Sequence, residues 1–212
     1  MIVGLTGGIA CGKSIVADTL ERMGVRVVDC DVLARELVRF GTGALQKITE
    51  VFGSRILNPD GSLDRKKLAD IVFSSSAERI KLESILHPLI KERLRVEIDE
   101  CKSRDEDLVI VAPLLIEAKV TDYVDVIWVV SSPIRLMIER LCKRDGISEL
   151  DAHRRINSQM PVEEKIKYAH YIIDNSGTIE ELKRQVTSTW EKMHKEFAAA
   201  RSPINVVGRG RS

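Results

Sequence analysis

The chain has 212 residues, of which 44% are hydrophobic and 31% charged, and its formal net charge is +1. This length suits one domain with insertions, and the ordinary apolar content excludes disorder over most of the chain. The balanced charge argues against a nucleic-acid-binding surface, and the longest apolar run, at 108–116, is shorter than the roughly 18 residues that cross a bilayer. With four scattered cysteines and no secretory pattern at its start, we expect a cytoplasmic protein that contacts neither nucleic acid nor membrane.

The first thirty residues predict a strand, a loop, a helix and a second strand. An apolar run at 2–6 leads into a glycine-rich turn, and a helical pattern with one apolar face follows over 14–23, before Gly24. A second apolar run covers 25–30. Two strands joined through a helix favour a parallel sheet.

The middle of the chain is predicted to be helical. Helical patterns cover 32–38 and 44–52, and a charged helical stretch runs from 62 to about 104. Pro88 interrupts this stretch and is expected to start or kink a helix. Because no strand pattern lies between 57 and 107, we expect a helical insertion in an α/β domain.

Strands and helices alternate again after the insertion. Three apolar runs complete a predicted five-stranded sheet: 108–112, 124–130 and 171–173. Ser132 is expected to cap the next helix with Pro133 at its first position, and a basic helical stretch follows over 148–168. Thr178 begins a capping box for the last helix, and the tail at 201–212 is expected to be frayed.

The strongest motif lies between the first strand and the first helix. Residues 7–14 read Gly-Gly-Ile-Ala-Cys-Gly-Lys-Ser, which fits the phosphate-binding pattern G-x-x-x-x-G-K-[ST]. Such a loop turns several backbone N–H groups into one concavity, and the following helix adds its positive N-terminal end. Lys13 is then placed to reach the β- and γ-phosphates, and Ser14 to ligate Mg²⁺. A glycine turn with a surface lysine is the alternative.

Two aspartates follow the second strand. Because the carboxyl ends of parallel strands border one crevice, Asp29 or Asp31 is expected to face the γ-phosphate. A carboxylate there orients Mg²⁺-bound water or accepts the proton of an attacking hydroxyl. The alternative is that Asp31 only caps the next helix.

A basic stretch follows the fourth strand. Arg140 and Arg144 lie four residues apart and share one helical face. A mobile arginine-bearing segment neutralises charge that develops in phosphoryl transfer while it excludes water. A solvated helical face is the alternative for this pair, and the favoured interpretation for Arg154 and Arg155.

Together these motifs resemble dephospho-CoA kinase. The similarity runs in order over residues 1 to about 190 and includes the phosphate loop, the two aspartates and these further segments: Ala34-Arg35, Leu86-His87-Pro88, 113–117, Arg140, Arg144, Gln159, Lys165 and 173–177. The resemblance implies an α/β fold of the P-loop NTPase type, with three α/β/α layers around a parallel five-stranded sheet. It also implies that ATP phosphorylates the 3′-hydroxyl of the ribose of dephospho-CoA, giving coenzyme A and ADP in the final step of coenzyme A biosynthesis.

The same resemblance divides the chain into regions and assigns roles. The implied regions are a kinase core at 1–56, 108–138 and 169–200, a CoA-binding helical insertion at 57–107, a lid at 139–168 and a flexible tail at 201–212. The implied ATP-binding residues are Gly8, Ile9, Ala10, Cys11, Gly12, Lys13, Ser14, Ile15, Arg144 and Asn175, with Ser14 also the Mg²⁺ ligand. The implied catalytic residues are Asp31 as the base, Lys13 and Arg140. Those expected near dephospho-CoA are Asp29 (also the second choice as base), Arg35, His87, Pro113, Leu114 and Glu117.

Two of these residues keep structural alternatives, and the loop departs from the family pattern. The alternative for His87 is capping before Pro88, and the alternative for Asn175 is a turn position. Ala10 stands where the family usually has glycine, which costs ~1 kcal/mol or more if that position has a positive φ. Cys11 replaces serine beside Lys13 at a helix N-terminus, which predicts an easily ionised thiol whose oxidation blocks ATP binding. Ile15 replaces threonine and loses a hydroxyl contact to the α-phosphate.

Other functions stay open at this stage. A kinase for another small molecule shares the loop, the carboxylate and the arginines, but the large helical insertion argues against a small alcohol as its acceptor. A GTPase switch would usually carry an Asn-Lys-x-Asp signature, which this chain lacks. A protein that binds nucleotide without turnover is disfavoured by Lys13, Ser14 and Asp31. A monomer or weak homo-oligomer is expected.

Overall fold

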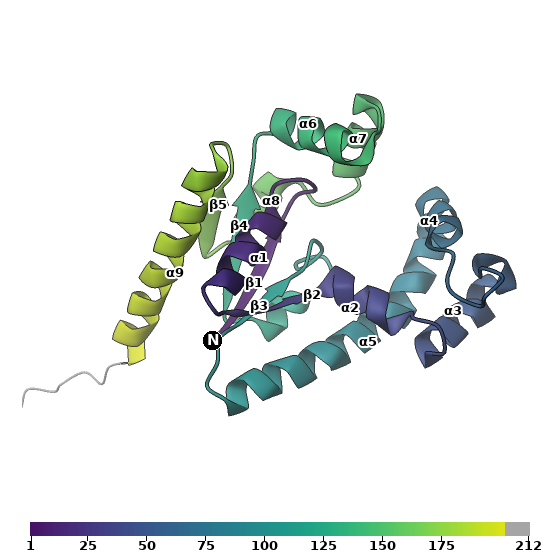
Figure 1. Ribbon diagram of the computed structural model, residues 1–212, viewed down its shortest axis with the longest axis horizontal. Coiled ribbons are helices and arrows are strands. Elements are labelled where there is room, and N and C mark those ends of the chain that lie inside the picture. Colours follow the sequence, from purple (N-terminus) through teal and green to yellow (C-terminus); the bar gives the residue numbers. More distant parts are fainter. Residues whose placement is uncertain (202–212) are drawn as a thin grey trace, which may run out of the picture.

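A computed structural model of the chain describes residues 1–201, so the predicted frayed tail lies outside the described residues apart from Arg201. Five strands form one parallel sheet in the order β2-β3-β1-β4-β5 (Figure 1): β1 (Ile2–Gly7), β2 (Arg26–Asp29), β3 (Leu108–Val111), β4 (Val126–Ser131) and β5 (Tyr171–Asp174). The predicted sheet is confirmed. Strands β1, β3 and nearly all of β4 are buried because both faces of the sheet are covered.

Helices connect the strands and cover the sheet. They are α1 (Lys13–Arg22), α2 (Cys30–Leu37), α3 (Gly43–Phe52), α4 (Arg65–Ser74), α5 (Ser76–Ser103), α6 (Ile134–Asp145), α7 (Glu149–Ile156), α8 (Val162–Ile166) and α9 (Ile179–Arg201), with 3₁₀ turns η1 (Ser54–Ile56) and η2 (Val120–Tyr123). No helix in this described part of the chain combines the length and the apolar character that crossing a bilayer requires.

Two apolar clusters, one on each face of the sheet, make the three layers. On one face, α1 and α9 pack against alternate residues of the strands, and Trp190 of α9 meets Trp128 of β4 edge-on at 5.9 Å between ring centroids. On the other face, residues of α2, α5 and α8 pack on the remaining strand residues. Alternation of side chains along each strand therefore feeds both clusters.

A third cluster forms a helical unit at one end of the molecule (Figure 1). It joins apolar residues of α3 and η1 to α4 and to the first half of α5. The second half of α5 packs instead on the sheet through Leu94, Ile98 and Cys101. The helical unit thus draws on residues before position 57, and α5 ties it rigidly to the core.

Two local expectations differ from the structure. Of the two alternatives for Pro88, a helix start is excluded, because α5 runs through this residue and packs on both sides of it. Ser132 does not cap α6: the cap position is Pro133, and the Ser132 hydroxyl donates to the Asn175 carbonyl at 3.0 Å. The capping box at Thr178 is confirmed, since its N–H donates to Glu181 Oε2 at 2.8 Å.

Candidate active site

The glycine-rich loop joins the end of β1 to the start of α1, as the motif predicts. Gly12, with φ of 100°, lies directly before α1 and turns the helix N-terminus toward the loop. A Cβ at Gly12 would collide with the Asn175 side chain, and one at Gly8 would lie 2.9 Å from Val162 of α8. The glycines therefore permit both the turn and the close approach of Asn175 and α8 to the loop. The loop and the N-terminus of α1 together form a site that suits an anion.

Three departures from the family pattern have different structural outcomes. Ala10 has φ of 59°, so the predicted strain of a left-handed alanine is present. Cys11 is fully buried in the apolar cluster of α1 and α9, with Sγ 3.9 Å from Lys13 Nζ. A thiol closed to solvent is closed to oxidants, so the structure does not support the predicted oxidation switch. Ile15 packs against the same cluster.

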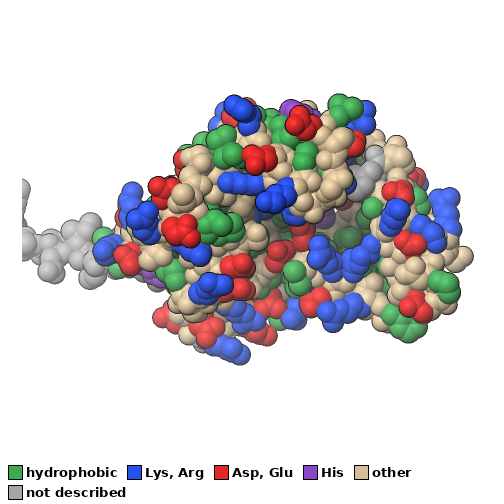
Figure 2. All heavy atoms as spheres, turned by 45° about the horizontal axis from the view of Figure 1, so that its top comes forward, with side chains coloured by type: hydrophobic (Ala, Val, Ile, Leu, Met, Phe, Trp, Pro, Cys, Tyr) green, Lys and Arg blue, Asp and Glu red, His purple; other side chains and the backbone are tan. Residues whose placement is uncertain are grey.

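A polar cavity of about 640 Å³ opens over the loop, a size that suits a bound small molecule. It is lined by Ile9, Ala10, Gly12, Lys13 and Ser14 of the loop, by Asp29, Asp31 and Arg35 beside β2, and by Arg144, Arg155, Ser158 and Gln159 from α6 and the α7 region. Figure 2 shows Lys and Arg side chains gathered around a hollow on this face of the molecule. The cavity therefore combines backbone donors with basic side chains, which suits phosphates.

Lys13 and Ser14, the last two residues of the motif, both line this cavity. Lys13 Nζ donates to the carbonyls of Gly7 at 3.1 Å and Gly8 at 2.8 Å, so its ammonium lies over the loop. Ser14 is exposed on the first turn of α1.

The two aspartates have different positions. Asp29 is the N-cap of α2 and accepts hydrogen bonds from the N–H groups of Asp31 at 2.7 Å and Val32 at 3.3 Å. Asp31 stands in the first turn of α2 and does not cap the helix, so the capping alternative for it is wrong. Desolvation and the neighbouring Asp29 raise the pKa of Asp31, while Lys13 and Arg35 oppose the shift. A carboxylate with a raised pKa is a better proton acceptor.

A second, apolar cavity lies against the polar one. Its walls come from α2, α5, the loop after β3 and η2, and they include Ala34, Leu82, Leu86, His87, Ile90, Ala112, Leu114 and Val120. His87 is half-buried within α5 and lines this cavity, so it does not cap a helix. Asp31 and Pro113 line both cavities and therefore stand where the two meet.

Arg140 and Asn175 lie behind the loop, outside the walls of the two cavities. The Arg140 guanidinium donates to Ser132 Oγ at 3.0 Å and to the Asn175 carbonyl at 3.2 Å. The Asn175 side chain is 3% exposed and donates to the Cys11 carbonyl at 2.7 Å. This chain of contacts holds the glycine-rich loop from α6 and β5, a role that the sequence did not predict.

Two other arginines enter the polar cavity. Arg144 bonds Asp145 at 2.7 Å, and Arg155 reaches the same carboxylate at 2.7 Å from α7. Both arginines line the polar cavity, Arg144 as a predicted ATP-binding residue and Arg155 as a residue that the sequence favours as solvated surface. The sequence gives no sign of this pairing, because the turn between α6 and α7 brings Arg144 and Arg155, eleven positions apart, to the same carboxylate.

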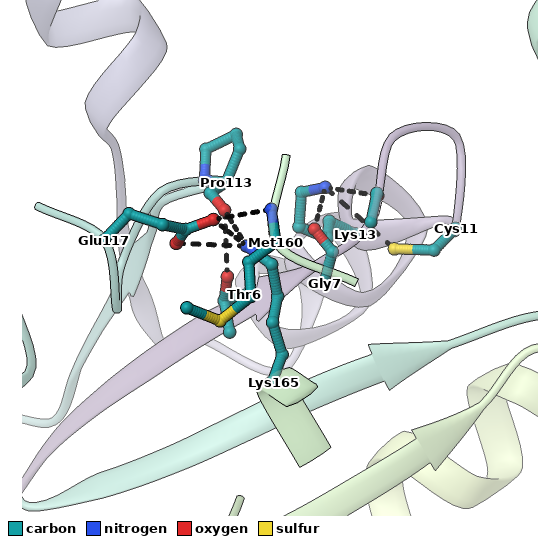
Figure 3. A network of polar contacts seen from close by, with 9 residues as sticks. Thr6, Gly7, Cys11, Lys13, Pro113, Glu117, Met160 and Lys165 are labelled. Atoms are coloured by element: carbon teal, nitrogen blue, oxygen red, sulfur yellow. Dashed lines mark hydrogen bonds and ion pairs between the residues drawn. The ribbon is translucent and has the colours of Figure 1, made fainter. Parts of the chain in front are cut away.

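A network of polar contacts joins the Pro113 loop to α8 (Figure 3). Lys165 is fully buried and donates to the Pro113 carbonyl at 2.6 Å and to Glu117 Oε1 at 2.9 Å. Glu117 therefore binds Lys165 and is absent from the walls of both cavities, although the resemblance placed it near the acceptor. Gln159 and Lys165 belong to the motifs that carried the resemblance, but no role was assigned to either.

Comparisons with known proteins agree with this geometry. A family model described as dephospho-CoA kinase matches residues 1–181. The chain is 47% identical over 193 residues to a dephospho-CoA kinase of Geobacter metallireducens, covering 91% of this chain and 96% of the relative. It is 45% identical to that of Geobacter sulfurreducens over 90% of this chain and 98% of the relative.

Solved structures show the same fold. A dephospho-CoA kinase from Campylobacter jejuni is similar with a TM-score of 0.70 and 26% identity, covering 92% of this chain and 98% of that one. A shikimate kinase from Bacteroides thetaiotaomicron, with a TM-score of 0.53, 12% identity and coverage of 92% and 98%, shares the fold alone. The chain therefore belongs to the dephospho-CoA kinase family, whose members phosphorylate dephospho-CoA with ATP in the last step of coenzyme A biosynthesis.

Proposed function

We propose that this chain transfers the γ-phosphoryl group of ATP to the 3′-hydroxyl of the ribose of dephospho-CoA. The observation that carries the proposal is the position of Asp31, which lines both the polar cavity and the apolar cavity. A donor nucleotide in the first and an acceptor in the second would meet at this carboxylate. Family membership supports the choice of acceptor.

Each wall of the polar cavity has a proposed task. The loop N–H groups and the N-terminus of α1 bind the phosphates of ATP, and Lys13 neutralises the β- and γ-phosphates. Arg144 and Arg155 stabilise charge on the transferring group from the other side of the cavity. Arg140, which the resemblance placed among the catalytic residues, acts through Asn175 on the loop.

Asp31 is the proposed general base. Its carboxylate accepts the proton of the acceptor hydroxyl as the oxygen attacks the γ-phosphorus and ADP leaves. One carboxylate oxygen of Asp29 already accepts the N–H groups that cap α2, so Asp29 is less suited to act as the base. Arg35, in the polar cavity, and His87 and Leu114, in the apolar one, are proposed to hold dephospho-CoA.

Mg²⁺ fits the polar cavity. Its preferred ligands are oxygens, and Ser14, Asp29 and Asp31 offer hydroxyl and carboxylate oxygens there. In residues 1–201 no cluster of three or more His, Cys, Asp or Glu side chains could hold a metal unaided, which agrees with an ion that arrives with the nucleotide. We propose Ser14 as its protein ligand; when bound, the ion neutralises charge on the β- and γ-phosphates.

The organisation of the chain forms part of the proposal. We propose a kinase core at 1–56, 108–138 and 169–200, acceptor-binding helices within 57–107 and a lid at 139–168. In the structure α3 and η1, which precede position 57, pack with the helical unit. Because one chain lines both cavities, the enzyme needs no partner copy, and we propose a cytoplasmic monomer or weak homo-oligomer that acts without nucleic acid. Light scattering of the purified protein tests the oligomeric state.

The function is tested by ADP release from the purified protein with Mg-ATP and one acceptor at a time. The acceptors are dephospho-CoA, adenosine, AMP and shikimate. Stimulation by dephospho-CoA alone, with coenzyme A as the product, is the expected result. Stimulation by another acceptor alone would contradict the proposal and point to a different small-molecule kinase.

A further inference from the structure

Lys165 is a buried cation outside the walls of both cavities. Its side chain is 0% exposed, and its ammonium contacts the Pro113 carbonyl at 2.6 Å and the Glu117 carboxylate at 2.9 and 3.2 Å. Burial lowers the pKa of Lys165, and the bond to Glu117 opposes that shift. Full burial of lysine is rare and costly unless the charge is paired, so this arrangement points to a specific task.

The contacts of this pair join three parts of the molecule (Figure 3). The Pro113 carbonyl also accepts from Thr6 Oγ1 at 3.2 Å, so β1 shares the same acceptor. Glu117 accepts in addition from the N–H of Met160 at 3.3 Å. Glu117 thus contacts both the segment between α7 and α8, at Met160, and α8 itself, at Lys165.

These joined parts border the place of reaction. Pro113 lines both cavities, and the segment that ends at Met160 contributes Arg155, Ser158 and Gln159 to the wall of the polar cavity. Loss of the contacts between Lys165 and Glu117 would therefore displace both Pro113, which lines the two cavities, and the segment that carries Arg155.

We propose that Lys165 and Glu117 are positioning residues that anchor the arginine-bearing segment to the Pro113 loop and so keep water from competing with the acceptor. This inference rests on the proposed function. If the anchor loosens, the oxygen of water bonds to the γ-phosphorus, the bond from that phosphorus to the β,γ-bridging oxygen breaks, ADP leaves, and the proton of water passes to Asp31 or solvent. Closed sites suppress such side reactions.

The test compares three substitutions in the full chain: Lys165→Met, Glu117→Gln and, as a matched control, Lys167→Met. Lys167 is the C-cap residue of α8, two positions after Lys165. It also pairs with a glutamate, Glu164, at 2.8 Å, but this pair is exposed. For each variant, ADP release from Mg-ATP is measured with and without dephospho-CoA, together with coenzyme A formed and the thermal unfolding midpoint.

The anchor variants should lower kcat/KM for both substrates by ~10- to 100-fold, the loss expected when reacting groups are misplaced by about 1 Å. Their fraction of ADP formed without coenzyme A should rise, whereas Lys167→Met should behave as the wild type. The double variant should lose no more than the more damaged single variant, because the pair acts as a unit.

The fraction of ADP formed without coenzyme A distinguishes an anchoring role of the pair from a contribution to folding stability alone. An unfolding midpoint that falls while the fraction of ADP formed without coenzyme A stays at the wild-type value would overturn the inference. If Lys165→Met does not fold, Glu117→Gln decides alone, since Glu117 keeps a quarter of its side-chain surface exposed and glutamine keeps an oxygen acceptor. A wild type that dephospho-CoA does not stimulate would overturn the proposed function and this inference together.

Discussion

The two cavities that meet at Asp31 are formed by different kinds of structure: short contiguous segments in one, and packed helices in the other. The polar cavity is formed mainly by two short segments: the loop at 9–14, which follows β1, and residues 29–35, which follow β2 on the other side of β3. The apolar cavity needs α2, the first half of α5 and the loop after β3, which packing brings together.

This difference separates two kinds of recognition. Backbone N–H groups and a few charges recognise a phosphate, and a contiguous motif supplies both. A larger acceptor needs a shaped apolar surface, which only the assembled helices provide. Substitutions in the two cavities should therefore affect the two substrates separately, except at Asp31 and Pro113, which line both cavities, and at Arg35, which is proposed to reach the acceptor from the polar one.

The largest effect on the polar cavity is expected from Lys13→Ala. The ammonium stabilises the phosphates in the ground state and the charge that develops during transfer, so kcat should fall by ~10²- to 10³-fold and KM for ATP should rise. Steady-state kinetics with each substrate varied, beside Lys66→Ala on the exposed face of α4, measure this. An equal rise of KM for dephospho-CoA would break the separation of the cavities.

His87→Ala is the corresponding change in the apolar cavity. The half-buried ring lines the cavity, and its loss should raise KM for dephospho-CoA by about tenfold, or about 1.4 kcal/mol. KM for ATP should stay unchanged, as should both constants in His153→Ala on the exposed surface of α7. If His87→Ala weakens ATP binding instead, the residue does not belong to the acceptor side.

Asp29→Asn sharpens the account of the residue where the cavities meet. Asparagine caps a helix as well as aspartate does, but it removes the negative charge that raises the pKa of Asp31. The base works only when it is ionised, so the acid limb of kcat/KM should move to lower pH. Arg35→Gln should move the limb to higher pH, because Arg35 lowers the same pKa. Shifts in the same direction for both variants would contradict this electrostatic account.

The smallest effect is expected at Ala10. Its φ of 59° costs an alanine ~1–2 kcal/mol, and Ala10→Gly removes that strain while it adds ~0.4–1 kcal/mol of unfolded-state entropy. The free energy of unfolding should therefore rise by at most about 1.5 kcal/mol, measured by urea denaturation. Ala77→Gly in α5 should instead destabilise, and a loss of stability in Ala10→Gly would show that the loop is not strained there.

The sequence predicted the sheet well because each strand is a short apolar run between polar turns. The loop could also be predicted, since its spacing has a direct chemical meaning. The division of α5 between the helical unit and the core could not be predicted, because Leu86 and Leu94 follow the same helical periodicity while facing different clusters.

Charged residues were harder to assign for a related reason. Both Asp29 and Asp31 suit a helix cap, and only the backbone shows that Asp29 takes that position. Arg140 and Arg144 share a helical face, yet one holds Asn175 and the other enters the cavity. The partners of long charged side chains depend on which groups the tertiary structure brings within reach, and the sequence does not show these groups.

The most direct test of the central claim is the rate of coenzyme A formation by Asp31→Asn beside the wild type. Without a base at the meeting point of the cavities, kcat should fall by ~10²-fold or more while KM for ATP changes little, because the loop still binds the phosphates. A kcat near that of the wild type would contradict the claim and move the role of the base to Asp29.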